Sequence, residues 1–340
     1  MVKIPPLAFI VPGAFEKTVE ISGFRPALQT LILPLSKCIC QEWGVKKENY
    51  ILQQFYNTLG LTLVLLTISS KQYQVLKVKC ARPIAALQYT LQGYTFTKLS
   101  GFGCLPLFEG TYTVQYISEG EHYILLEPGN YQYLYIVPNE GLDLLFSNHD
   151  AIQQLSAYLD TSHCCGKLAT RLPILTETKK LIQNLLSPMP TDKSQHFYLS
   201  SKLLELIGHF HQQLLSAYPA SYTHDNLFSY INTFLADNIE MPVPDIIKDI
   251  KHRFYWGTST LRKTWMLAGA KTNSSNSVLP PRFFATQLRL KLALYLLIIE
   301  HLPVTNVANR LGFYDVAAFR RQFYNRYKNN PSKTEAFVNI

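Results

Sequence analysis

The sequence predicts an α+β fold in which a β-rich N-terminal domain is followed by a helical segment and then by an all-α C-terminal domain. Two observations carry this prediction: strand-like runs separated by turns fill residues 56–138, and helical periodicity replaces them from residue 150 onward. A chain of 340 residues that is 47% hydrophobic is long enough for two or three domains. We place the domains at residues 1–165, 166–218 and 219–340.

The β-rich domain is indicated by apolar and aromatic runs of strand length. Residues 1–55 are mixed in character, and within them the stretch 36–43 predicts the start of a short helix. From residue 56 to residue 138, glycine-containing turns separate the strand-like runs LTLVLLTI, YQVLKV, AALQYTL, YTVQYI, HYILLE and YQYLYIV. Short strands at such regular spacing are typical of a β-barrel or a β-sandwich.

Three helices are predicted between the β-rich domain and the C-terminal domain, over residues 150–159, 177–187 and 197–217. The third helix carries a broad apolar stripe formed by Leu199, Leu203, Leu206, Ile207, Phe210, Leu214 and Leu215. Two interpretations of this stripe stay open. It packs against the β-rich domain, or it forms the seam of a homodimer.

The segment 303–331 has the pattern of a helix-turn-helix. Gly312 can adopt the positive φ that the turn needs, and the small Ala308 lets the two helices approach closely. Asp315 can cap the second helix because its carboxylate accepts hydrogen bonds from the free backbone N–H groups there. The apolar face of that helix holds Phe319, Phe323 and Tyr327, and Arg320, Arg321 and Arg326 lie off that face.

This segment resembles the second helix-turn-helix of the AraC/XylS family of transcription regulators. The resemblance rests on Ala308, Leu311-Gly312-Phe313, Phe319-x-Arg321-x-Phe323 and Pro331, which match the family spacing without a gap. It implies a cupin-like barrel in the N-terminal domain, which acts as a sensor, and a helical linker. It also implies two helix-turn-helix units that insert recognition helices into the major groove of double-stranded DNA.

The resemblance also places the upstream parts of the DNA-binding domain. Arg289-Leu290-x-x-Ala293-x-x-Leu296-Leu297 matches the long helix, here 283–300, that joins the two units in this family. The first unit then starts near Asn226 and has helices at 242–251 and 258–267, the latter capped by Thr258, Ser259 or Thr260. Its turn, KHRFYWGTS, looks about four residues too long, and TNSSNSVLPP adds roughly nine more. These departures leave open whether the first unit reads bases or only grips the DNA backbone.

The resemblance implies DNA contacts from the outward positions of the two recognition helices, 258–267 and 315–327. Arginine can bond two acceptors on guanine, which makes Arg320 the first choice for base contact, and small apolar side chains can pack on a thymine methyl group. Arg321 is equally suited to a phosphate contact or to an internal ion pair. The expected DNA-binding residues are Thr258, Ser259, Arg262, Lys263, Tyr314, Val316, Ala317, Arg320, Arg321 and Lys328.

The N-terminal domain of such a regulator is expected to hold an effector. Tyrosines are dense there, and aromatic rings with polar tips suit either a pocket for an organic ligand or ordinary strand packing. The motif Tyr198-Leu199-x-x-Lys202-x-x-Glu205-Leu206 resembles the linker helices of siderophore-responsive regulators of the AraC type. A siderophore-like or other organic small molecule is therefore the expected effector. RNA polymerase and a second copy of the chain are further candidate partners.

Charge and hydropathy narrow the function classes. The net charge is +9, and residues 219–340 hold 15 Lys and Arg against 8 Asp and Glu, as expected for a domain that meets phosphate groups. The first residues lack the pattern of a secretory signal, and no apolar run has the length of a membrane span. We therefore expect a cytoplasmic protein without a membrane partner.

We expect no metal, no cofactor and no enzymatic activity. Cys38-x-Cys40 and His163-Cys164-Cys165 lack a second pair at zinc-finger spacing, so free thiols are the favoured interpretation of the six cysteines. His122 stands without the clustered ligands of a catalytic cupin, and no phosphate-binding or nucleophile–base motif occurs. The alternative function is a non-catalytic ligand-binding or protein-interaction β-barrel protein with a degenerate helix-turn-helix.

Overall fold

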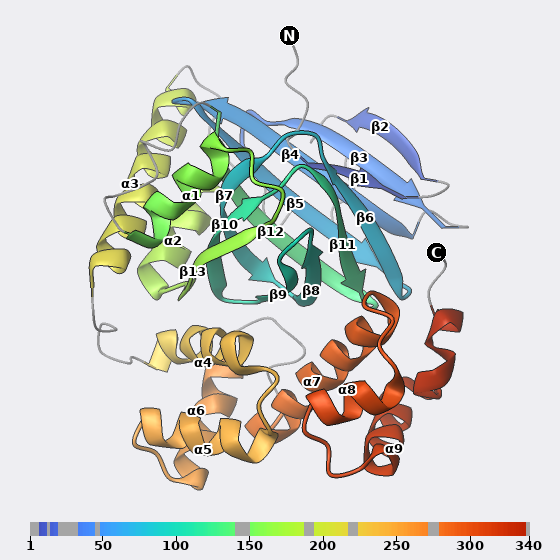
Figure 1. Ribbon diagram of the computed structural model, residues 1–340. Coiled ribbons are helices and arrows are strands. Elements are labelled where there is room, and N and C mark those ends of the chain that lie inside the picture. The colour runs from blue at the N-terminus through green and yellow to red at the C-terminus, as the bar shows by residue number, and fades with distance from the viewer. Residues whose placement is uncertain are drawn as a thin grey trace.

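The N-terminal part of the chain is β-rich and its C-terminal part is helical, which is the predicted fold class (Figure 1). The computed structural model describes residues 7–11, 14–19, 33–44, 48–139, 150–186, 194–216, 224–270 and 279–337. Residues 219–223 and most of the expected insertion 272–281 lie outside these ranges. Among the described helices, none combines the length and the apolar character that crossing a membrane requires.

Two antiparallel sheets make up the β-rich part. The five-stranded sheet has the order β1-β6-β11-β8-β9, with bounds Leu7–Ile10, Gln74–Cys80, Gly120–Leu126, Tyr94–Leu99 and Gly103–Phe108. The eight-stranded sheet has the order β13-β10-β7-β12-β5-β4-β3-β2. The bounds of its strands are Lys167–Pro173, Thr111–Ile117, Ile84–Gln92, Gly129–Pro138, Leu61–Ser70, Asn49–Thr58, Lys37–Trp43 and Phe15–Val19. All six strands expected between residues 61 and 138 are present, and β8 and β9 occur there in addition.

Strand β5 shows how the eight-stranded sheet serves two hydrophobic cores. Val64 and Leu66 face the core between the two sheets, whereas Leu63 and Leu65 face the core beneath the helices. Successive side chains of a strand point to opposite faces, so a strand that is covered on both faces has no polar side. This double burial explains why LTLVLLTI is an almost continuous apolar run.

Helices α1 (Asp150–Asp160), α2 (Thr176–Leu185) and α3 (Gln195–Leu215) cover the outer face of the eight-stranded sheet (Figure 1). Phe210 of α3 packs against Tyr112 of β10 with ring centroids 6.2 Å apart, and the Tyr112 hydroxyl donates to Gln213 Oε1 at 2.9 Å. Leu199, Leu203, Leu206, Ile207 and Phe210 are buried. Most of the apolar stripe of α3 therefore packs against the β-rich part, and Leu215 lies outside that contact.

Two strands lie where the sequence predicted helix. The short helix expected at 36–43 is wrong, because β3 pairs with both β2 and β4 and buries Cys38 and Cys40 on one face. The segment 166–218, expected to be helical, begins with β13, which pairs with β10. The eight-stranded sheet therefore takes an edge strand from beyond residue 165.

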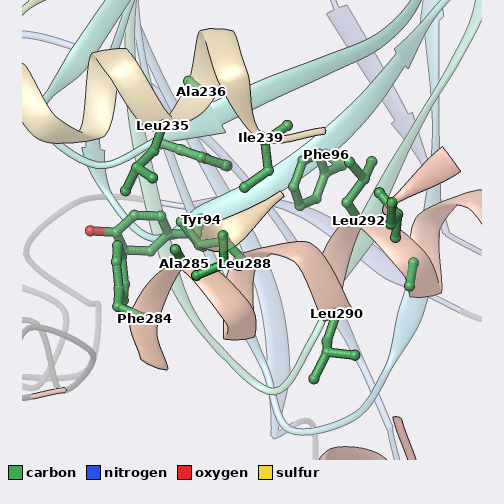
Figure 2. Close-up of a cluster of buried hydrophobic side chains, with 14 of the residues drawn as sticks. Tyr94, Phe96, Leu235, Ala236, Ile239, Phe284, Ala285, Leu288, Leu290 and Leu292 are labelled. Atoms are coloured by element: carbon green, nitrogen blue, oxygen red, sulfur yellow. The ribbon is translucent and has the colours of Figure 1, made fainter. Parts of the chain in front are cut away.

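The C-terminal helices do not form a core of their own. They are α4 (His224–Asn238), α5 (Val243–Arg253), α6 (Thr258–Ala270), α7 (Pro281–Ile298), α8 (Val304–Arg310) and α9 (Val316–Tyr327), followed by a 3₁₀ segment, Pro331–Phe337. Figure 2 shows Tyr94 and Phe96 of β8 between α4 and α7, and the rings of Tyr94 and Phe284 are 5.3 Å apart. Asn232 of α4 also donates to the Tyr94 hydroxyl at 3.0 Å. The hydrophobic core of the C-terminal helices thus extends onto β8, β9 and β11.

Candidate nucleic-acid interface

The second helix-turn-helix unit consists of α8 and α9, joined by the turn 311–315. Gly312 has a φ of +59°, and a Cβ at this position would lie 3.3 Å from Pro242 Cγ, so both backbone conformation and space favour glycine. Asp315 caps α9 by accepting a hydrogen bond of 2.5 Å from the backbone N–H of Ala318. Ala308 is buried at the approach of the two helices. The sequence predicted each of these features, and together they determine how α9 is presented.

The outward face of α9 and its flanks hold most of the second-unit residues that were expected to contact DNA. The exposed members are Tyr314, Ala317, Arg320, Arg321 and Lys328. Arg321 forms no ion pair with any described residue, which leaves its guanidinium open to a phosphate. Val316 differs from the expectation, because its side chain is partly buried against the helical core and so is not an outward position.

Arg326 points toward the β-rich part, although the sequence placed it off the apolar face of α9. Its guanidinium donates to Glu127 Oε2 at 2.7 Å and also to Gln287. The same carboxylate accepts from the Tyr327 hydroxyl at 2.7 Å and lies 3.2 Å from Lys291 Nζ. We call Glu127, Lys291, Arg326 and Tyr327 the Glu127 cluster. It ties the C-terminal end of α9 to the connection between β11 and β12 and leaves the N-terminal half of α9 facing outward.

In the Glu127 cluster one carboxylate is shared by two cations. Burial alone raises the pKa of the Glu127 carboxyl, but the charges of Lys291 and Arg326 and the hydrogen bond from Tyr327 together outweigh burial and hold that pKa below its usual value. The carboxylate is therefore ionised in the folded protein at neutral pH. Because this one anion faces two cations, its loss would leave both of them buried.

The first helix-turn-helix unit consists of α5 and α6, and its turn is not too long. Helix α5 has 11 residues and α8 has 7, so the extra residues extend the helix and the turn spans only 254–257. Tyr255 adopts a φ of +54° within this turn. Helix α6 begins at Thr258, and the carbonyl of Gly257 accepts from the backbone N–H of Leu261 at 3.0 Å. Gly257 therefore occupies the capping position that was expected for a hydroxyl side chain.

The face of α6 that was expected to contact DNA is exposed. Its members are Thr258, Ser259, Arg262 and Lys263. Leu261 and Trp265 are buried on the opposite side, as the sequence predicted. Lys251 of α5 donates to Thr258 Oγ1 at 3.2 Å, so a cation also lies at the start of α6.

Several cations of the two second helices are free of ion pairs. Arg262, Lys263 and Arg320 are exposed and form no ion pair with a described residue, and the same holds for Lys248 and Arg282 elsewhere in the domain. Arg310, by contrast, bonds Glu240 at 2.6 Å, and Arg289 is buried beneath the turn of the second unit, 5.5 Å from the Phe313 ring. The two surfaces that would meet phosphate thus carry unpaired positive charge, although they are not alone in this.

Helix α7 sets the relative position of the two units. Most of its residues are buried, and it contacts α5, α6, α8 and α9. Both units therefore pack on a single rigid helix. Figure 1 shows them on the side of the molecule that faces away from the sheets.

A cleft with a volume of about 560 Å³ lies between the two parts of the chain. Helices α2 and α3 and strand β13 form one wall, and α4 and α5 form the other. Arg171 of β13 is buried there, pairs with Asp237 of α4 and donates to the carbonyl of Pro106 at 2.9 Å. Phe234 and Arg253 line the opposite wall, with the guanidinium 5.0 Å from the ring. This volume falls within the range typical of small-molecule sites.

The space between the two sheets is filled by side chains. The cavities that the described residues leave there measure about 10 and 30 Å³, room for no more than a water molecule or two. Between the sheets the Tyr133 hydroxyl bonds Thr95 at 2.8 Å, and on the helix-covered face of the eight-stranded sheet the rings of Tyr89 and Tyr112 lie 4.8 Å apart. The tyrosines of the strands thus serve packing, which was one of the two interpretations of their density.

His122 has a structural role. Its Nδ1 accepts from the backbone N–H of Ser100 at 3.1 Å, and its Nε2 lies 2.9 Å from the carbonyl of Ser118. Burial lowers the pKa of this imidazole, which keeps it neutral. Both ring nitrogens are therefore used within the protein.

The chain matches no protein-family model and no curated protein. Among solved structures, the AraC-like transcriptional activator CuxR superimposes with a TM-score of 0.33 at 9% identity, covering 75% of this chain and 89% of CuxR. ToxT from Vibrio cholerae with a bound unsaturated fatty acid gives a TM-score of 0.29 at 12% identity, covering 84% and 98%. A second ToxT crystal form gives 0.25 at 11% identity, covering 83% and 100%. Similarity this low leaves function to this chain's own residues.

Proposed function

We propose that the chain is a sequence-specific DNA-binding transcription regulator of the AraC type. The observation that carries this proposal is the pair of exposed, uncompensated basic faces on α6 and α9. Each face belongs to the second helix of a helix-turn-helix, and both units pack on α7. Residues 219–340 are the DNA-binding domain, residues 1–165 with β13 are the sensor domain, and the rest of 166–218 is the linker.

In this function α6 and α9 lie in successive segments of the major groove. Arg320 bonds two acceptors of a guanine, and Ala317 packs on a thymine methyl group. Arg321 and Lys328 contact phosphates and set the register. In the first unit Arg262 lies at the equivalent outward position and contacts the DNA from α6. With a turn of ordinary length, the first unit is as well shaped for base contact as the second.

We infer that the cleft between the two parts holds the effector, a siderophore-like or other organic molecule. A ligand in the cleft touches the linker on one wall and the first helix-turn-helix unit on the other, so its binding changes how that unit is held. Thr233→Trp, on the α4 wall, places a bulky ring in the cleft and narrows it. This variant is expected to bind DNA with an affinity that small-molecule cell extracts no longer change. A response equal to that of the wild type would place the effector elsewhere.

We further propose a homodimer through the exposed face of α3, with RNA polymerase as the second protein partner. Phe197, Leu204 and Leu215 are 80%, 52% and 73% exposed. Their spacing places them on one side of the helix, opposite the residues that contact the sheet. Leu204→Glu is expected to make the protein monomeric in sedimentation, whereas Gln212→Glu, also exposed on α3, is expected to leave the dimer intact. A wild type that sediments as a monomer would exclude this face as a dimer seam.

The proposed function is tested by DNA binding of the full-length chain. The fragment 219–340 is unsuitable, because its core includes residues of β8, β9 and β11. Affinity for duplexes selected from a random pool is expected to fall linearly with the logarithm of salt concentration. Absence of salt-dependent duplex binding would exclude a DNA-binding regulator. A footprint over one groove segment rather than two would favour the protein-interaction alternative.

Arg320→Ala tests the assigned base contact. It is expected to weaken binding to the selected duplex by about 1–3 kcal/mol and to relax preference at one base pair. Lys79→Ala removes the same charge from exposed β6 and is expected to leave binding unchanged. An equal loss on selected and random duplexes would show that Arg320 touches only the DNA backbone.

A further inference from the structure

Three soft metal donors converge in the loop between α1 and β13. One ligand atom from each of His163, Cys164 and Cys165 lies within 4.8 Å of the other two. The two Sγ atoms are 3.7 Å apart. Cys164 is exposed and the other two residues are partly buried, so the cluster is open to solvent on one side.

The separation of the two sulfur atoms fits a tetrahedral metal centre. With metal–sulfur bonds of about 2.3 Å and tetrahedral angles, two thiolates that share a cation lie about 3.8 Å apart. The observed Sγ–Sγ distance therefore already corresponds to one edge of the tetrahedron. The imidazole of His163 needs only a small side-chain movement to reach a third corner.

The surrounding structure holds the loop in place. A Cβ at Gly101, which has a φ of +70°, would lie 2.6 Å from Cys165 Sγ, so the loop packs directly on a glycine turn. The Tyr116 hydroxyl donates to the carbonyl of His163 at 2.7 Å, and the Tyr158 ring stacks on the imidazole at 4.3 Å. The donors are thus supported by aromatic side chains from β10 and α1, which is the support that a metal site needs.

The Nδ1 lone pair of His163 is held by the loop backbone. His163 Nδ1 accepts from the backbone N–H of Cys165 at 3.1 Å, which leaves the ring proton on Nε2. A cation on Nδ1 would replace this hydrogen bond and keep the same tautomer. Binding of a thiophilic cation to the two sulfur atoms releases the thiol protons.

We propose that His163, Cys164 and Cys165 bind one thiophilic d¹⁰ cation, such as Zn(II), Cd(II) or Cu(I), and leave its fourth position open to water or another ligand. Thiolate and imidazole donors select these ions over Mg²⁺ and Ca²⁺. No further His, Cys, Asp or Glu of the described part of the chain joins the cluster. This inference does not depend on DNA binding. The sequence alone favoured free thiols here because three consecutive residues need not converge on one point.

The experiment titrates the reduced, metal-free, full-length protein with Cd(II) and follows the ultraviolet thiolate-to-cadmium charge-transfer absorption. We expect saturation at one equivalent. Cys164→Ser and Cys165→Ser are each expected to lower the affinity by about tenfold or more and to reduce the absorption by roughly half. His163→Ala is expected to lower the affinity while keeping the absorption. Competition with a chromophoric chelator gives the corresponding Zn(II) affinities.

Cys104→Ser is the matched control, because this partly exposed thiol of β9 lies outside the cluster. It is expected to bind Cd(II) like the wild type, and thermal unfolding checks that all variants are folded. Non-saturating binding, or wild-type affinity in the Cys164→Ser variant, would overturn the proposal. Wild-type affinity in His163→Ala would overturn the assignment of the imidazole as the third donor.

Discussion

Glu127→Ala is the sharpest test of how the two parts of the chain are held together. The side chain of Glu127 is 13% exposed, and those of Lys291 and Arg326 are 12% and 18% exposed. Removing the carboxylate leaves two cations buried without the anion that they share. Breaking a buried ion pair in this way costs about 3–5 kcal/mol. The two pairs share one carboxylate, so their contributions are coupled rather than additive.

The assay is urea-induced unfolding followed by tryptophan fluorescence. Trp43 reports on the β-rich part, and the buried Trp265 reports on the first helix-turn-helix unit. Glu127→Ala is expected to lower the free energy of unfolding by about 3–5 kcal/mol. Glu240→Ala breaks only the exposed pair with Arg310 and is expected to cost at most about 1 kcal/mol. Equal losses in the two variants would refute the claim that the Glu127 cluster clamps the interface.

The pH dependence of unfolding stability, compared between the wild type and Glu127→Gln, gives a second check on the role of the Glu127 charge. The folded-state pKa of Glu127 lies below its unfolded value of about 4.3. Its stabilising contribution is therefore fully present above that unfolded value and is lost as pH falls through the folded value. The stability difference between the wild type and Glu127→Gln is expected to be constant near neutrality and to shrink in acid. A difference that persists at the lowest pH would point to packing rather than charge.

Other substitutions isolate local features, and urea unfolding measures each of them. Asp315→Ala removes the cap of α9 and should cost about 1 kcal/mol, which Asp315→Asn largely restores; an unchanged stability would contradict the cap. Gly312→Ala should cost about 1 kcal/mol or more at its positive φ, whereas Gly208→Ala, with open space inside α3, should be neutral or stabilising. Burial raises the pKa of Glu109 to about 7, above its unfolded value, so stability falls as pH rises from about 4 to 7. In the Glu109→Gln variant, stability should no longer fall over this pH range. A pH profile identical to that of the wild type would exclude Glu109 as the cause of the fall.

The strands were predictable where they are buried on both faces or alternate in polarity. Strand β5 is an apolar run for this reason, and β12, which is rich in tyrosine, is likewise buried along most of its length. The segment of β3 contains two cysteines, a glutamine and two charged residues, which favour no single period. It becomes a strand because β4 pairs with it along its whole length. Strand character that depends on a neighbouring strand is poorly visible in local sequence.

The candidate interface was predictable only in part, for a similar reason. The outward position of Arg320 follows from helical spacing, because Phe319 and Phe323 define the inner face of α9. The inward position of Arg326 does not follow from spacing, since its partner Glu127 lies 199 residues earlier in the chain. In the first unit the extra residues lengthen α5 rather than the turn, and only the observed end of the helix at Arg253 decides this.

Short-range chemistry was sufficient to determine the second helix-turn-helix. Gly312, Asp315 and the aromatic face of α9 act on residues within a few positions of themselves, so their effects can be read from spacing alone. Tertiary structure decided the shared core, the Glu127 cluster, the cleft between the two parts and the meeting of Cys164 and Cys165 with His163. These features depend on which distant segments pack together or on the path of a loop backbone, and neither is encoded in local periodicity.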